Sequence, residues 1–184
     1  NINISTDGFF FYLQIILKHN LLDFLRINGI TVHEVENLPE AGFLESILLK
    51  DGEMYITPEA KISSILHEAG HLAIIPAQFR HFASGDLRGL QQMFDALDNE
   101  PPDSPLMRAA LQCGDTEATA WAYAVGVHLG IPEKFIIQDD EYSGTGNEIR
   151  AMVAIGHYLG VHGLQHAGMC LKREWPRLIR WVQI

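Results

Sequence analysis

Residues 62–75 read ISSILHEAGHLAII, and this apolar stretch contains the pattern H-E-x-x-H from His67 to His71. An α-helix advances about 100° per residue, so side chains four positions apart project from nearly the same face. His67 and His71 can therefore both reach one Zn²⁺ ion. Glu68 is adjacent to His67, where it can hold a water molecule at the metal and take its proton. The spacing predicts a zinc-binding helix that carries its own general base.

The surroundings of the motif favour a functional site over a chance match. Chance matches to so short a pattern typically fall on exposed, polar helices. This helix is expected from about residue 59 to residue 75, between Pro58 and Pro76, and is apolar around its circumference. Two imidazoles and a carboxylate inside a buried helix are costly without partners. The small side chains of Ala69 and Gly70 would let a neighbouring element approach the metal.

A catalytic zinc site has three protein ligands and one open position. The preferred third ligand is Glu117, within the sequence DTEATAWA at residues 115–122, because these small residues allow a helix to pack close to the first one. Two other interpretations stay open. The helix dipole stabilises an acid in the first turn, with Asp115 as N-cap, so Glu117 can have a purely structural role. Asp115 can itself be the ligand, which would shift the start of the helix but not the chemistry.

The two stretches together resemble a known arrangement. HEAGH at 67–71 followed by EATAWA at 117–122 is similar to the gluzincin pattern, in which a glutamate on a downstream helix completes the zinc site. The small size of the chain and the run on to GIP at 130–132 resemble the ImmA/IrrE-like metallopeptidases within that group. The resemblance covers roughly residues 45 to 132.

This resemblance implies a zincin-like fold, with His67, His71 and Glu117 as zinc ligands and Glu68 as general base. The chain differs from that family in the longer gap between the two motifs and in Thr119, where asparagine is usual. It also shows no helix-turn-helix module, which many of those relatives carry.

Periodicity and turn residues predict the remaining elements. Apolar spacing predicts a helix over 8–28, which Asn28-Gly29 ends. Strands are expected at 30–35, 44–50 and 54–57, the last two joined by Asp51-Gly52, a favoured hairpin turn. Further helices are expected at 87–97, 115–129, 147–160 and 174–182, with a proline-rich surface loop at 99–105. The pattern predicts one α+β domain over 1–184, with a small antiparallel or mixed sheet packed on a mainly helical body.

Two further features bear on catalysis. The strand Met54 to Thr57 leads into the active helix and is expected to be a sheet edge that pairs with an extended substrate. A donor is needed for the developing oxyanion, and the candidates lie in the histidine- and glycine-rich segment 157–166. The catalytic candidates in this segment are His157, Tyr158 and His162, with His166 as a further possibility, and Tyr123 is a candidate outside it. The alternatives are a second metal site, or partly buried histidines beside a helix break.

Composition narrows the class of protein. The 184 residues carry a formal net charge of −10, from 13 Lys plus Arg and 23 Asp plus Glu, which disfavours nucleic-acid partners. The two cysteines form no C-x-x-C pair, which favours a reducing compartment and a cytoplasmic location. The apolar stretch 9–17 is far shorter than the roughly 20 residues that cross a bilayer. Neither a membrane span nor a signal peptide is expected.

The sequence therefore predicts a zinc-dependent metallopeptidase that acts on a peptide or protein. Glu68 favours an enzyme, because a purely structural zinc site needs no general base. Two alternatives are kept: a non-catalytic zincin-fold regulator or sensor, and an amidase that acts on a small molecule. The sequence carries no signal for oligomeric state.

Overall fold

The computed structural model describes residues 6–42, 44–84 and 87–184. Within these ranges, helices greatly outnumber strands, and the strands all precede the second helix. The elements in chain order are α1 (Thr6–Ile27), β1 (Val32–Glu34), β2 (Ile47–Lys50), β3 (Glu53–Ile56), α2 (Ile62–Ile74), the 3-10 helix η1 (Ala77–Phe82), α3 (Leu87–Ala96), α4 (Pro105–Ala110), α5 (Asp115–His128), α6 (Glu133–Ile136), α7 (Glu141–Gly144), α8 (Gly146–Ala154) and α9 (Leu159–His166).

The sheet has the order β1-β3-β2, with β1 parallel and β2 antiparallel to β3. The predicted α+β fold, with a small mixed sheet and a mainly helical remainder, is confirmed. The prediction that Met54 to Thr57 forms a sheet edge is wrong, because β3 lies between the other two strands. The connection between β1 and β2 leaves a position for one strand between them, and β3 occupies that position. The edge that follows the hairpin is β2.

The hairpin turn itself is as predicted. Asp51 has φ 51° and Gly52 has φ 81°, and two successive positive φ angles are typical of a type I′ turn. A short-range signal therefore sets the pairing of Lys50 with Glu53.

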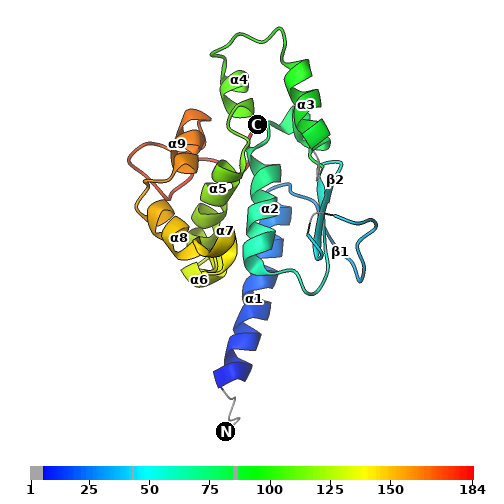
Figure 1. The fold of residues 1–184 in the computed structure, drawn as a ribbon, viewed down its shortest axis with the longest axis vertical. Helices are drawn as coiled ribbons and strands as arrows, with labels where there is room; N and C mark the ends of the chain where they lie inside the picture. The colour runs from blue at the N-terminus through cyan, green and yellow to red at the C-terminus, as the bar shows by residue number, and fades with distance from the viewer. Residues whose placement is uncertain (1–5, 43, 85–86) are drawn as a thin grey trace.

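Helix α2 lies at the centre of the molecule, with the sheet on one side and α5 on the other (Figure 1). The two helices approach closely at Gly70, where an added Cβ would lie 2.7 Å from the carbonyl oxygen of Ala118. Ala69 and Ala118 are completely buried. The small residues of both stretches thus bring the H-E-x-x-H helix against the start of α5, as the sequence predicts.

Long-range contacts change the C-terminal third. The helix predicted over 147–160 ends at Ala154, turns at Gly156 (φ 75°) and resumes as α9 at Leu159. The helix predicted over 174–182 is wrong: the segment forms turns, and Leu178 makes an isolated bridge with Cys170. Trp175 Nε1 donates a hydrogen bond to the carbonyl of Val153 (2.7 Å), and such anchors replace helical hydrogen bonds here.

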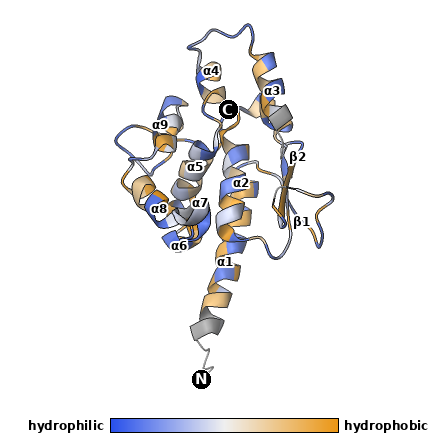
Figure 2. Ribbon diagram, in the orientation of Figure 1, coloured by the Kyte–Doolittle hydropathy of each residue, from blue (hydrophilic) through white to orange (hydrophobic). Residues whose placement is uncertain are grey.

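The top of the molecule matches the prediction in part. The connection between α3 and α4 forms no helix or strand and is mostly hydrophilic (Figure 2), as expected for the loop at 99–105. Helix α4 was not predicted. Ser104 caps it by accepting a hydrogen bond from the backbone N–H of Met107 (3.0 Å).

The N-terminal half of α1 extends beyond the rest of the molecule (Figure 1). Large apolar side chains on it, such as Phe11 and Ile16, are more than half exposed, whereas Leu21 and Leu25 on its other half are completely buried. In the part of the chain that the structure describes, no helix is both long enough and apolar enough to cross a membrane.

Candidate metal centre

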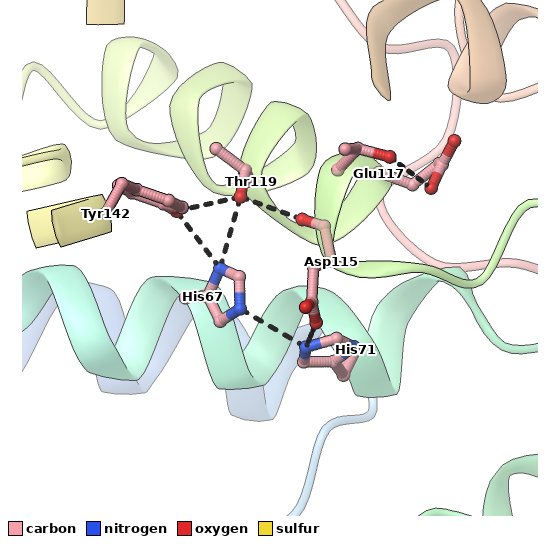
Figure 3. A network of polar contacts seen from close by, with 7 residues as sticks. His67, His71, Asp115, Glu117, Thr119 and Tyr142 are labelled. Atoms are coloured by element: carbon pink, nitrogen blue, oxygen red, sulfur yellow. Dashed lines mark hydrogen bonds and ion pairs between the residues drawn. The ribbon is translucent and has the colours of Figure 1, made fainter. Parts of the chain in front are cut away.

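Three potential metal ligands converge where α2 faces the start of α5 (Figure 3). They are His67, His71 and Asp115, whose ligand atoms all lie within 4.8 Å of one another. His67 Nε2 lies 3.3 Å from His71 Nε2, and His71 Nε2 lies 3.2 Å from Asp115 Oδ1. We call these three residues the His-His-Asp cluster.

The spacing of the cluster fits a zinc ion. Ligands about 2.0–2.1 Å from a tetrahedral Zn²⁺ lie about 3.3 Å from one another, and both measured separations match this value. Two imidazoles and a carboxylate are also a donor set that catalytic zinc uses, with the fourth position left open. The residues present therefore suit such an ion in chemistry and in two of their three separations, and the third pair, His67 with Asp115, lies within 4.8 Å.

Electrostatics favour the metal-binding forms of two of the three groups. Burial, reinforced by the neighbouring His71, lowers the pKa of His67 to about 4, so this imidazole is neutral at pH 7 with a lone pair free for a metal. Asp115 has an exposed side chain, and its hydrogen bond with His71 lowers its pKa, so the carboxylate is ionised. A divalent cation would compensate the negative charge of this donor set.

Thr119 fixes the tautomer of His67. Its hydroxyl donates to the carbonyl of Asp115 (2.8 Å), one helical turn earlier. A hydroxyl has only one hydrogen, so Thr119 Oγ1 accepts from its other neighbours, among them Tyr142 Oη at 2.8 Å and His67 Nδ1 at 3.4 Å. His67 therefore carries its hydrogen on Nδ1, which leaves Nε2 free to bind a metal.

Tyr142 also contacts the imidazole of His67. Its hydroxyl lies 3.5 Å from His67 Nδ1, and burial raises its pKa to about 12, so it stays a hydrogen-bond donor. Tyr142 and Ser143 have φ angles of 55° and 60°, a backbone region that non-glycine residues rarely adopt. Such backbone strain often occurs at functional sites. Nothing in the sequence around Tyr142 indicates this role, whereas Thr119 could have been found from its i, i+4 relation to Asp115.

Glu68 lies beside the cluster on the wall of a cavity. Burial is the main cause that raises the pKa of its carboxyl group above the ordinary value. A carboxylate with a raised pKa holds a proton more readily than an exposed glutamate does. Its position and its environment both suit a group that accepts and returns a proton.

The structure does not bring Glu117 to the two histidines. Two residues along a helix rotate a side chain by about 200°, so Glu117 leaves α5 on the face opposite Asp115. Figure 3 shows it extending away from both imidazoles. The hydroxyl of Thr116 donates a hydrogen bond to its Oε2 at 2.9 Å. Its carboxylate occupies the space that a side chain at Gly163 would need.

The segment 157–166 contributes differently from what its histidines suggest. His157, His162 and His166 are exposed, and none of them lines the cavity at the cluster. Tyr158 is half-buried, and a hydrogen bond with Thr119 partly offsets the increase in its pKa caused by burial. The glycines serve packing: a Cβ at Gly160 would collide with the carbonyl of Thr116, so α9 lies directly against the start of α5.

Tyr123, the remaining candidate, is buried and donates its hydroxyl to Glu133 at 2.6 Å. It does not contribute to the cavity lining. Its hydrogen bond joins α5 to α6, which is a structural contact.

The cavity at the cluster has a volume of about 650 Å³, within the range typical of small-molecule sites. Its polar wall includes all three cluster residues, Glu68 and Tyr142, and strand β2 borders it. Comparison of the chain with protein-family models, with curated proteins and with solved structures gave no match. The interpretation of the site therefore depends on its own geometry.

Proposed function

We propose that this protein is a zinc-dependent metallopeptidase with a zincin-like arrangement, in which His67, His71 and Asp115 hold the metal and Glu68 is the general base. The observation that carries this proposal is the His-His-Asp cluster beside the half-buried Glu68, in a cavity of the size typical of ligand sites. Asp115 takes the place that the resemblance gives to Glu117.

Bound zinc would supply Lewis-acid polarisation of a carbonyl and would make water a better acid. The chain's own residues do the rest. Glu68 takes the proton of the attacking water and passes it to the leaving amine, a transfer that its raised pKa assists. Thr119 holds His67 in the tautomer that directs Nε2 to the ion.

Strand β2 offers a means of holding the substrate. It pairs with β3 on one side only among the described strands, and Ile47, Leu48 and Leu49 border the cavity. An extended peptide can add to such an edge through main-chain hydrogen bonds, which bind any sequence alike. This role, assigned to residues 54–57 from sequence, passes to β2. His157 and His162 are exposed and have no step here, while Tyr158 forms a hydrogen bond with Thr119.

The ligand assignment predicts how two single substitutions differ. Asp115→Ala should lose bound zinc, because it removes one of three ligands, whereas Glu117→Ala should keep it. Zinc content per chain after dialysis, measured by elemental analysis, checks this, with circular dichroism as the control for folding. Retained zinc in folded Asp115→Ala, together with loss in folded Glu117→Ala, would return the role to Glu117.

The general-base assignment predicts a separation of binding from catalysis. Glu68→Gln should keep zinc and lower the rate of hydrolysis of an unfolded test protein by about 10²- to 10⁴-fold, because the amide cannot accept the proton. Initial rates of zinc-loaded wild type and variant measure this effect. A wild type that binds zinc but cleaves nothing across a broad peptide library would favour the non-catalytic regulator instead.

A further inference from the structure

The solvent-facing side of α1 changes character along the helix. Where α1 packs on the body of the molecule, this side is polar: His19 Nε2 and Arg26 Nη1 lie 3.3 Å and 3.9 Å from the carboxylate of Asp23. One and two turns earlier, where α1 extends beyond the body (Figure 1), the same side is apolar or aromatic. We call its members the α1 stripe: Phe11, Tyr12, Ile15 and Ile16. A contiguous apolar patch on a solvent-facing helix side is typical of an interaction surface.

The α1 stripe points away from the body. Leu17 and Leu21, one turn apart, anchor α1 to the core and are 8% and 0% exposed. Ile15 is two residues before Leu17 and Tyr12 is nine before Leu21, separations that turn a helix by about 200° and about 180°. The exposed fractions of the stripe accordingly run from 50% for Ile15 to 62% for Phe11. In this arrangement, no described part of the same chain can cover the stripe.

The area of the α1 stripe is close to what a dimer of two copies needs. An aromatic side chain presents about 150–250 Å² when fully accessible, and every member of the stripe is at least half exposed, so the stripe offers roughly 400 Å². Two copies that cover each other's stripe would bury roughly 1,000 Å² in total, once flanking atoms are included. That area lies at the lower end of the range for specific protein interfaces, which is about 1,000–2,000 Å².

Charge argues against a lipid surface as the partner. Helices that lie on membranes flank their apolar face with lysine and arginine. Residues 6–20 contain one such cation, Lys18, and its ammonium group donates to the carbonyls of Pro58 (2.9 Å) and Ala60 (3.1 Å). The formal net charge of the chain is −10, and anionic lipids would repel it. A second copy of this chain needs no cation at the stripe, because its own stripe is apolar.

From these observations we propose that the α1 stripe is a dimerisation surface, on which the stripes of two copies pack as an antiparallel helix pair. A two-fold interface uses the same patch on both copies, so one stripe per chain is sufficient. Parallel packing would bring two bodies with a net charge of −10 each to the same end of the pair. Antiparallel packing places them at opposite ends. The proposal does not depend on the metal site.

A charge placed in the α1 stripe tests the dimer. Sedimentation equilibrium of the wild type should show the mass of two chains as concentration rises. Ile15→Glu should raise the Kd of the dimer by about 100-fold, because each dimer would bury two unpaired carboxylates. The matched control is Ile27→Glu, the same substitution on α1 at a residue that is 84% exposed and three turns from the stripe, and it should leave the Kd unchanged. Circular dichroism checks folding, and Tyr12→Ser is the milder variant if Ile15→Glu does not fold.

Three results would overturn the proposal. A wild type that stays monomeric over the whole concentration range has no such dimer. An equal rise of the Kd in Ile27→Glu and Ile15→Glu would place the interface elsewhere. The third is flotation with vesicles of phosphatidylcholine and phosphatidylserine, in which the wild type should stay in the soluble fraction; flotation that Ile15→Glu abolishes would assign the α1 stripe to a membrane. Small-angle scattering checks the orientation, since an antiparallel pair should give two maxima in the distance distribution and a parallel pair only one.

Discussion

Thr119 has one hydroxyl hydrogen and several polar neighbours, and this imbalance defines its role. The hydrogen goes to the carbonyl of Asp115, so the oxygen serves Tyr142 and His67 as an acceptor. Loss of this acceptor would free the imidazole of His67 to rotate or to change tautomer. Polar partners of this kind typically contribute about 10- to 100-fold to metal affinity.

Thr119→Val keeps the shape of the side chain and removes the acceptor, so we expect the Kd for zinc to rise about 10- to 100-fold. Thr119→Ser, which keeps the hydroxyl, should restore binding. Competition with a chromogenic chelator measures the Kd. Thr116→Val is the matched control, because the Thr116 hydroxyl bonds to Glu117 and not to the cluster. A Kd that stays at the wild-type value in Thr119→Val would refute this role.

At the scale of single residues, the sequence predicts the two histidine ligands on α2 but does not decide which residue of α5 is the third ligand. The i, i+4 rule alone aligns His67 and His71. The choice between Asp115 and Glu117 depends on how α5 is rotated about its axis. That rotation is set by contacts distant in sequence, above all by Gly160 and Gly163, which admit Thr116 and Glu117 to the surface of α9. Tyr142 reaches the cluster from a separate turn, α7, and no local sequence pattern predicts this contact.

The contact between α2 and α5 decides where the cluster forms. A Cβ at Gly70 would lie 2.7 Å from the carbonyl oxygen of Ala118 and 3.0 Å from its Cα, and both are backbone atoms. The two helices must therefore separate if position 70 gains even a methyl group. Such a shift moves Asp115 away from the imidazoles.

Gly70→Ala should lower the free energy of unfolding by about 1–3 kcal/mol, the usual cost of overpacking a core. It should also weaken zinc binding, although the substitution touches no ligand. Urea denaturation of the metal-free protein and a zinc titration measure the two effects. Gly42→Ala, in the loop before β2, is the milder control, since its nearest neighbour would be 3.2 Å away. Wild-type stability and wild-type zinc affinity in Gly70→Ala would show that α2 and α5 can accommodate the methyl group without separating.

At the scale of the whole molecule, the C-terminal strap ties distant parts together. We use this name for residues 181–184. Gln183 donates its backbone N–H to the carbonyl of Ala73 (2.7 Å) and its side-chain amide to that of Ala167 (2.9 Å), and its own carbonyl accepts from Arg80 Nη2 (3.1 Å). The end of α2, η1 and the turn after α9 therefore share one residue, which is 3% exposed.

Removal of Gln183 and Ile184 together should lower the free energy of unfolding by about 3 kcal/mol, because the hydrogen bonds to Ala73, Arg80 and Ala167 are lost at about 1 kcal/mol each. Removal of Ile184 alone should have little effect, since its side chain is 81% exposed and Gln183 keeps all three partners. Denaturant midpoints of the two truncated chains measure the difference. Similar midpoints would mean that the strap contributes no net stability.

The predictable parts of the fold depend on residues close together in the sequence. The other parts depend on contacts between residues far apart in the sequence. Asp51-Gly52, Pro58 and the small residues at 115–122 act within a few positions, and the hairpin, α2 and α5 follow from them. The central place of β3 depends on a long connection. The strap and the turns after Gly168 depend on anchors such as Trp181, whose carbonyl accepts from Trp121 Nε1 at 2.7 Å. An apolar pattern over 174–182 does not show whether those side chains pack within a helix or against distant parts of the molecule.

The close approach at Gly70 also has a consequence for evolution. The obstacle to a larger residue there is the backbone of Ala118, which every amino acid at position 118 would present in the same place. No substitution on α5 can compensate for one at position 70. Among homologues with this helix pair, position 70 should therefore stay glycine without a covarying partner. Covariation methods would then miss the very contact that assembles the site.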